Sequence, residues 1–151
     1  MLFSFCVEVI ILNAFEITKE KFKEMDIPVR IDEVEDCNLI WWNETIGDSG
    51  IQGGIFIFFR KDHNIYDFLI QNFVSVDVGT SQVTRMLEIC NEFNRTISYA
   101  KMYVDEDGAV TVQVKRDYGE FDVEDLIGCI SVILNILGKE YITRIMKVKW
   151  S

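Results

Sequence analysis

Apolar and polar residues follow two successive periods between Ser81 and Lys115, and this stretch gives the clearest structural signal in the chain. In its first half the apolar residues recur at the spacing of one helix face, at Val83, Met86, Leu87, Cys90 and Phe93. Thr80 or Ser81 can cap the first turn, because a side-chain hydroxyl accepts a hydrogen bond from a free backbone N–H group. We therefore predict an amphipathic helix that ends near Asn94.

After this helix the pattern changes to the strict alternation of two strands. One side of the strands carries the apolar residues Ala100, Met102, Val104, Val110, Val112 and Val114. Asp105-Glu106-Asp107-Gly108 lies between the strands, and Gly108 accepts the positive φ that a tight turn requires. We predict a hairpin with one buried face. The acidic turn does not fit a calcium loop, because valines occupy the later ligand positions.

The segments before this unit predict a short helix followed by strands. The helix should cover 18–25, with Phe22 and Met25 inward, and end before Pro28. The candidate strands are 29–33, 39–43, 54–59 and 65–74, although a helix remains possible for the last of these. Residues 54–59 are apolar on both faces, which predicts a central strand covered on both sides. Residues 2–15 are too uniformly apolar to distinguish a strand from a buried helix.

A long final helix is predicted from Phe121 to Met146, with Asp122 as its N-cap. Its apolar residues cover more than the ~100° stripe that packing on one sheet requires. A second surface must bury the excess, either residues 1–15 or another molecule. A row of small residues, Gly128, Ser131, Asn135 and Gly138, would let a neighbouring backbone come close. We predict a self-association interface at Leu126, Ile130, Ile133, Ile136, Leu137 and Ile142.

Composition and charge narrow the class of protein. The 151 residues are 49% hydrophobic with a single proline, which indicates one folded domain over 1–151 and excludes a disordered chain. With 25 acidic against 15 basic residues, the surface should repel phosphate backbones, so we expect no nucleic-acid partner. Four irregularly spaced cysteines suit reduced thiols in a cytoplasmic protein. The N-terminal run contains Glu8 and is shorter than the ~20 residues of a membrane span, so we expect none.

No complete catalytic, metal or cofactor site is evident in the sequence. Gly47-Asp48-Ser49-Gly50 resembles a serine-protease segment, but His63 is the only histidine and lies in a predicted turn of its own. One histidine without ligands at the right spacing gives no zinc site. Asn91 and Asn94 at the end of the central helix suit a structural role, fixing the angle between helix and strand, and a ligand-binding role is the alternative.

The segment CNEFNRTISYAKMYVDEDGAV resembles the YbjN-like family of small bacterial proteins, labelled as sensory-transduction regulators. The similarity covers roughly residues 80–146 and is carried by Asn91, Asn94, Lys101, Tyr103, Asp107 and Gly108. It implies an α+β fold similar to type III secretion chaperones, with an antiparallel sheet against helices in the order α-β-β-β-α-β-β-α. Such proteins are small, acidic, cytoplasmic and often dimeric, and they bind other proteins. The family supplies no catalytic residues.

Two functions are consistent with these features. The first is a non-enzymatic cytoplasmic protein-binding module, chaperone-like or regulatory, that acts as a homodimer and binds a further protein partner. The second is a small-molecule sensor whose pocket lies between helices and sheet and is lined by Trp41, Trp42, Phe56 and Phe58.

Overall fold

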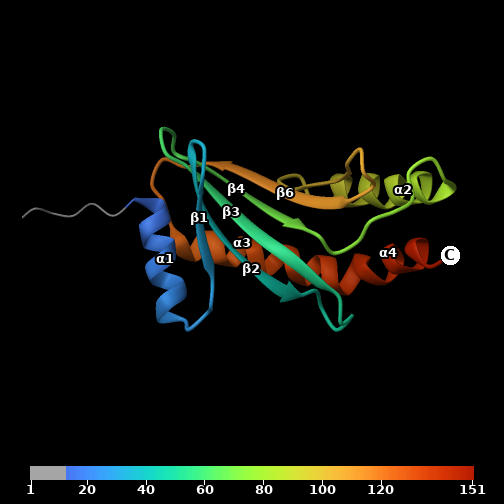
Figure 1. Cartoon of the computed structure of the whole chain (residues 1–151), viewed down its shortest axis with the longest axis horizontal. Coiled ribbons are helices and arrows are strands. Elements are labelled where there is room, and N and C mark those ends of the chain that lie inside the picture. The colour runs from blue at the N-terminus through green and yellow to red at the C-terminus, as the bar shows by residue number, and fades with distance from the viewer. Residues whose placement is uncertain (1–12) are drawn as a thin grey trace, which may run out of the picture.

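The computed structural model describes residues 13–151, which form an α+β fold with one six-stranded antiparallel sheet (Figure 1). The helices are α1 (Ala14–Glu24), α2 (Ser81–Thr96), α3 (Val123–Ile136) and α4 (Ile142–Lys149), with a π-helical segment η1 (Leu137–Tyr141) between the last two. The strands are β1 (Arg30–Val34), β2 (Cys37–Thr45), β3 (Gln52–Arg60), β4 (Ile65–Gln71), β5 (Lys101–Val104) and β6 (Val110–Asp117). Four strands precede α2. Each coincides with a strand predicted from the sequence pattern, but the order implied by the family resemblance contains only three.

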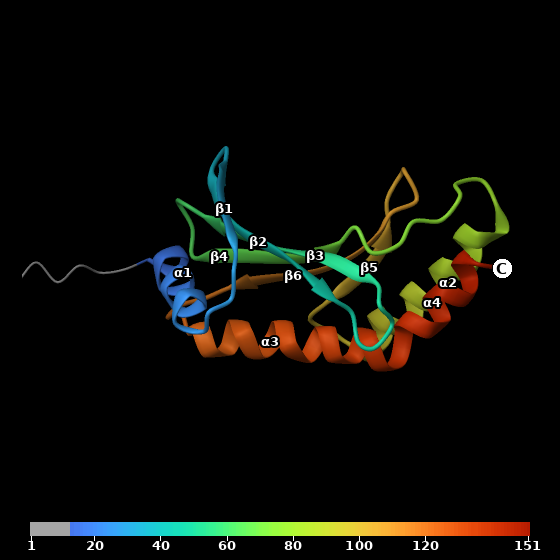
Figure 2. The same cartoon turned by 60° about the horizontal axis from the view of Figure 1, so that its bottom comes forward.

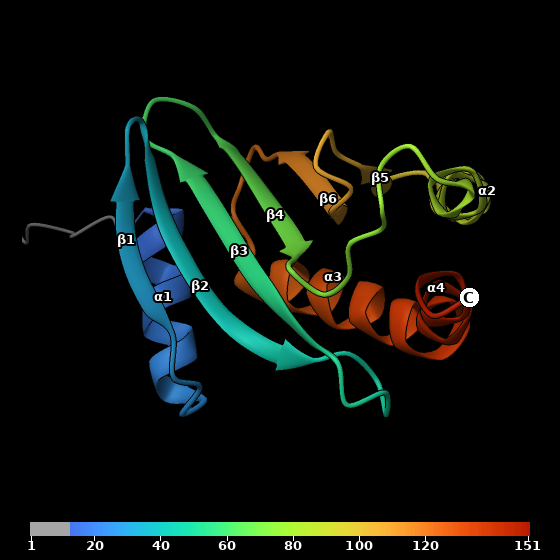
Figure 3. The same cartoon turned by 45° about the vertical axis from the view of Figure 1, so that its right-hand side comes forward.

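The strands lie in the order β1-β2-β3-β4-β6-β5, and the helices cover one face of the sheet (Figures 2 and 3). We call this the inner face and the opposite one the outer face. Helices α1 and α3 lie beneath β1 to β4, while α2 lies beside β5 and packs against α4. Ion pairs join the helices, with Lys21 bonded to Glu124 across 2.8 Å and Arg144 to Glu92 across 2.6 Å.

Local sequence signals explain where the elements begin and turn. The Thr80 side chain accepts from the Gln82 N–H and caps α2, and Asp122 caps α3 in the same way. Gly108 has a φ of +87° in the turn between β5 and β6. The Asp105 carboxylate there accepts from the backbone N–H groups of Asp107 and Ala109. The predicted helix, hairpin and caps of this region are therefore confirmed.

The core lies between the inner face and the helices. Alternate residues of the central strands point into it and are almost fully buried: Ile40, Ile55, Ile57, Phe59, Tyr66, Phe68, Ile70, Val112 and Val114. The prediction that Tyr66, Phe68 and Ile70 share one side of a strand is confirmed. The prediction that β3 is covered on both faces is wrong, because Phe56 and Phe58 point outward and stay partly exposed.

The first helix differs from its prediction at both ends. It begins at Ala14 rather than Thr18, with the Asn13 side chain accepting from the Glu16 N–H. Phe22 is buried as predicted, but Met25 is 44% exposed, because the helix ends at Glu24 and Asp26 turns the chain with a φ of +54°. Of the N-terminal apolar run, residues 1–12 lie outside the described part of the chain.

The final helix is continuous from α3 to α4, but its hydrogen-bond pattern widens at η1. Of the predicted interface residues, Leu126, Ile130, Ile133, Leu137 and Ile142 are at most 5% exposed within the single chain. The self-association surface that we predicted is thus core, because the sheet, α1 and α2 together bury the wide apolar stripe. Only Ile136 keeps partial exposure, and Val132 beside it is 47% exposed.

Candidate functional site: the outer face of the sheet

No helix of residues 13–151 covers the outer face of the sheet (Figure 2). This face carries a cluster of large apolar side chains. We call Trp41, Phe56, Phe58 and Leu69 the outer-face cluster, and all four are partly exposed. The strand register brings them together, because Trp41 lies opposite Phe56 and Phe56 lies opposite Leu69. Partners in antiparallel strands point to the same face, so these side chains form neighbouring rows across β2, β3 and β4.

Stacked rings and a guanidinium hold the edge of this cluster in place. The rings of Trp41 and Phe56 are nearly parallel, with centroids 5.6 Å apart, and the Arg30 guanidinium lies 4.7 Å from the Trp41 ring. The Trp41 indole N–H also donates to the Asp32 carboxylate across 2.9 Å. These contacts span β1, β2 and β3, and they fix Trp41 in one orientation while leaving part of its surface open.

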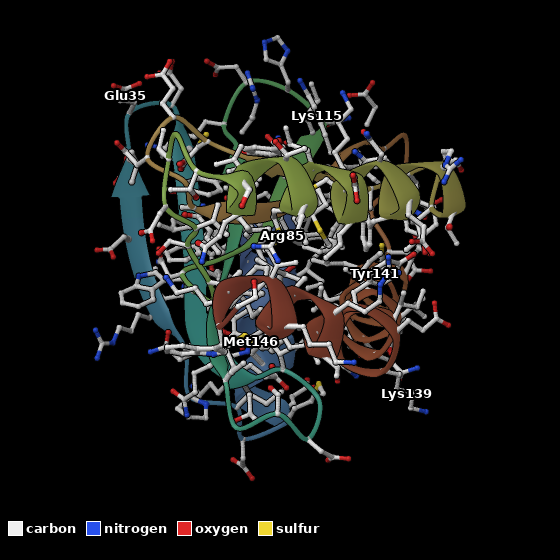
Figure 4. All side chains as sticks on the ribbon, turned by 90° about the vertical axis from the view of Figure 1, so that its right-hand side faces the viewer. Glu35, Arg85, Lys115, Lys139, Tyr141 and Met146 are labelled. Atoms are coloured by element: carbon white, nitrogen blue, oxygen red, sulfur yellow. The ribbon has the colours of Figure 1, made fainter. Side chains whose placement is uncertain are left out.

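Charged residues lie beside the apolar rows. Asp67 on β4 is opposite Phe58 on one side and Lys115 on the other. Its Oδ1 atom is buried and has no hydrogen-bond partner among the described residues. Lys101 on the edge strand β5 continues the row of Leu69 through Gln113. In Figure 4, Lys115 lies near the top of the molecule, away from the last helical run, whereas Lys139 extends from the lower side of that run.

Trp42, unlike Trp41, points inward, so the two tryptophans lie on opposite faces as predicted. Its ring packs against Phe22 of α1 with centroids 5.0 Å apart. The aromatic pocket predicted between helices and sheet is therefore not built as expected, because Trp41, Phe56 and Phe58 lie on the other face. Of the four aromatic residues predicted to line the pocket, Trp42 is the one that lines an inner hollow, whose volume is about 120 Å³.

A second concave region lies between the β2–β3 loop and the π-helical segment. The backbones of Gly47 and Gly138 approach so closely that a Cβ on Gly138 would lie 2.8 Å from the Gly47 Cα. Of the predicted row of small residues, Gly138 thus meets a neighbouring backbone, that of the chain's own loop. The cleft beside this contact has a volume of about 620 Å³ and is lined by Asp48, Ser49, Asn135, Lys139 and Thr143 together with apolar neighbours.

Asn94, Asn91 and Gly108, which were predicted to have structural roles, differ in the contacts that they make. The Asn94 amide bonds both backbone groups of Met102, accepting from its N–H at 2.7 Å and donating to its carbonyl at 3.1 Å. It therefore ties the end of α2 to β5. Asn91 is exposed on the same helix. A Cβ on Gly108 would lie 2.1 Å from the Val76 carbonyl oxygen, so this position requires glycine.

The described residues bring no metal-binding set together. No group of three or more His, Cys, Asp or Glu side chains among residues 13–151 is placed to hold a metal ion. The Ser49 hydroxyl donates to the Ile46 carbonyl at 2.6 Å, which gives it a structural role in the loop. Cys90 and Cys129 are buried, and burial raises the pKa of the Cys90 thiol to about 11, which makes it a poor nucleophile.

The sequence alone could not predict that the outer-face cluster is open. Apolar residues at every position of 54–59 show that both sides of β3 are apolar, but this pattern is the same whether the second side is covered or open. The helical run Val123–Lys149 is the single described segment with the length and hydropathy of a membrane span, which is weak evidence because core helices of other proteins pass the same test. The chain matches no protein-family model and no curated protein.

Proposed function

We propose that this chain is a non-enzymatic protein-binding module, chaperone-like or regulatory, that binds a protein partner through the outer face of its sheet. The observation that carries the proposal is the outer-face cluster, held beside Arg30 and left open by every described helix. Contiguous exposed apolar surface on a folded domain marks interaction sites. Tryptophan, tyrosine and arginine are also enriched among the residues that contribute most binding energy at protein interfaces.

The resemblance to the YbjN-like family supports the same proposal. The similarity covers roughly residues 80–146, from α2 to the last helical run, and the chain's helix, antiparallel strands, helix, hairpin and helix follow the implied order with one additional strand before α2. A function similar to that of type III secretion chaperones would place the protein in the cytoplasm. Chaperones of that kind bind other proteins along extended surfaces, and an open sheet face with partly exposed aromatic side chains could provide such a surface.

Self-association is a separate element of the proposal and no longer involves the core residues of the last helix. A homodimer must use surface that one chain leaves exposed, and a face occupied by a second copy could not bind the partner at the same time. The dimer interface that we propose therefore lies outside the outer face. Sedimentation velocity across micromolar concentrations tests this directly. A dimer that the double variant Phe56→Thr, Leu69→Thr still forms would support it, whereas a monomer at all concentrations would remove this element.

Selection from a displayed library of random 12-residue peptides tests protein binding without a known partner. We expect the full chain to enrich peptides with apolar residues, and we expect the double variant Phe56→Thr, Leu69→Thr to bind the enriched peptides at least tenfold more weakly. Threonine keeps the β-propensity of these positions, and thermal melting checks the fold. Val132→Ala on α3 is the matched control, because Val132 is 47% exposed but lies far from the outer face. Equal binding by all three proteins would reject the proposal.

A small-molecule sensor is the second candidate, and the cleft beside Gly47 and Gly138 is the observation that favours it. Its volume of about 620 Å³ and its polar groups, among them Asp48 and Lys139, are of the kind that small ligands use. A thermal-shift screen against metabolites tests this candidate, since a ligand at about 100 times its Kd adds roughly 2.7 kcal/mol to stability. Stabilisation that is lost in Lys139→Ala would favour it, and a screen without any stabilising compound would count against it.

A further inference from the structure

The Asp67 carboxylate occupies an unusual position in the outer face. It lies in the middle strands, with Phe58 directly opposite on β3 and Leu69 two residues along its own strand. Its Oδ1 atom is buried and accepts no hydrogen bond from residues 13–151. Lys115 lies opposite on β6, but the described residues form no ion pair between the two side chains. One oxygen of Asp67 is thus buried beside Phe58 without a donor among residues 13–151, while the residue as a whole is partly exposed.

Burial of an unpaired carboxylate oxygen opposes folding, because the group loses its hydration and gains no hydrogen bond in return. An apolar residue at this position would complete the rows that Phe58 and Leu69 begin. Residues that lower stability in this way are typical of functional sites, where the missing partner belongs to a ligand. Asp67 therefore supplies, independently of the apolar cluster, a sign of what the outer face binds.

The groups around Asp67 favour a planar cation as the ligand group that bonds its carboxylate. A carboxylate oxygen binds a charged N–H donor most strongly, and a guanidinium can bond it while its flat face packs on an aromatic ring. The outer face already contains such a contact, since the Arg30 guanidinium lies 4.7 Å from the Trp41 ring. The chain's formal net charge of −10 favours a basic partner over an acidic one.

We propose that the outer face binds a segment of a partner protein that presents an arginine side chain to Asp67, with the guanidinium bonded to Oδ1 and packed beside Phe58. This inference rests on the proposed function and adds to it the chemistry of the partner. The apolar side chains of the segment contact Trp41, Phe56 and Leu69, and the arginine fixes the register of the segment on the sheet. Asp67 is thus the specificity-determining residue of the surface.

The test compares peptides selected by the full wild-type chain with their arginine-to-glutamine counterparts. Loss of a charge-assisted hydrogen bond should weaken binding to the wild type by about 10- to 100-fold. The Asp67→Asn variant should bind both peptides with affinities within about threefold of each other, since its partner charge is gone. Binding of the arginine peptide to the wild type should also weaken as ionic strength rises.

The stability of the free protein provides the second readout. Asp67→Leu should raise the melting temperature, because it removes a carboxylate that has one buried, unpaired oxygen and extends the apolar row. Lys115→Met, which removes the one cation opposite Asp67, should leave peptide discrimination unchanged. A lower melting temperature for Asp67→Leu together with changed discrimination in Lys115→Met would show that Lys115 already pairs with Asp67, and it would overturn the inference.

The outcomes separate this inference from the proposed function. If the double variant Phe56→Thr, Leu69→Thr binds selected peptides as the wild type does, the outer face is not the binding surface and both proposals fail. If that variant loses binding but the selected peptides lack arginine, or Asp67→Asn still discriminates between the two peptides, then only the role of Asp67 is wrong.

Discussion

At the scale of single residues, Asn94 joins two elements that the chain connects by a turn of four residues, 97–100. Its side-chain amide forms both a donor and an acceptor bond with the backbone of Met102, where a neighbouring strand would otherwise provide these partners. β5 is an edge strand, so its outward backbone groups have no strand beside them. Asn94 therefore satisfies part of the sheet's edge and fixes the position of α2 at the same time.

We expect Asn94→Ala to lower the free energy of unfolding by about 1–2 kcal/mol, because two hydrogen bonds to the Met102 backbone are lost. Asn91→Ala is the control on the same helix, and its exposed side chain should change stability by less than about 0.5 kcal/mol. Urea denaturation monitored by circular dichroism measures both values. Equal effects of the two substitutions would contradict the structural role assigned to Asn94.

At the scale of elements, the last helical run adapts to the loop between β2 and β3. The run widens into η1 where Gly138 meets Gly47, and both residues lack the Cβ that would keep the two backbones apart. Gly47 also has a φ of +57°, which glycine adopts without strain. A π-helical turn inside a longer helix is rare and is often found at functional sites. Here it borders the cleft lined by Asp48, Asn135 and Lys139.

Two glycines of this run should respond to alanine in opposite ways. A Cβ on Gly138 would lie 2.8 Å from the Gly47 backbone, so Gly138→Ala should destabilise the protein by about 1–3 kcal/mol. A Cβ on Gly128 has no heavy atom within 4 Å, so Gly128→Ala should stabilise it by about 0.5–1 kcal/mol through helix propensity. Differential scanning calorimetry distinguishes the two, and a gain in stability for both would show that the loop does not press on the helix.

The same elements show what a sequence can predict and where it stops. Periodicity and caps located α2, the β5–β6 hairpin and the start of α3, because these signals are local. They did not show which surfaces meet. The wide stripe of the last helix is buried by α1 and α2 from the same chain, so Ile133 and its neighbours are core rather than interface. The open side of β3 and the contact between Gly47 and Gly138 likewise depend on distant segments.

At the scale of the whole molecule, buried titratable groups limit the stability of the fold at high pH. Burial raises the pKa of Tyr66 from its ordinary value of 10.0 to about 12, and it raises the pKa of Cys90 from 9.0 to about 11. Both groups are held protonated in the folded chain and lose their protons more easily in the unfolded chain. Their contribution to stability is therefore complete below pH 9 and is lost as the pH rises through 11 and 12.

We expect the free energy of unfolding to fall between pH 9 and 12, by on the order of 2 kcal/mol for each of the two groups. Tyr66→Phe should flatten the fall above pH 10.0, since phenylalanine has no proton to lose. Tyr103→Phe is the control, because Tyr103 is 39% exposed on the edge strand. Urea unfolding at a series of pH values provides the comparison. An identical pH profile for the wild type and Tyr66→Phe would contradict this account.

The helix layer and the sheet layer of the molecule differ in the apolar surface that they expose. The helix layer buries most of its apolar residues in the core, although Met25, Leu87, Val132 and Trp150 are 44%, 43%, 47% and 77% exposed. The sheet buries its inner face and leaves Trp41, Phe56, Phe58 and Leu69 of its outer face partly exposed. The central claim is therefore that the protein contacts its partner with the strands rather than with the helix whose apolar sequence first suggested an interface.

Mapping of backbone amide chemical shifts during titration with a selected peptide tests this claim most directly. The account predicts that the shifts concentrate on β2, β3 and β4, around Trp41, Phe56, Asp67 and Leu69, and that they disappear with the double variant Phe56→Thr, Leu69→Thr. Shifts concentrated on α3 around Val132, or in the cleft beside Gly138, would contradict it.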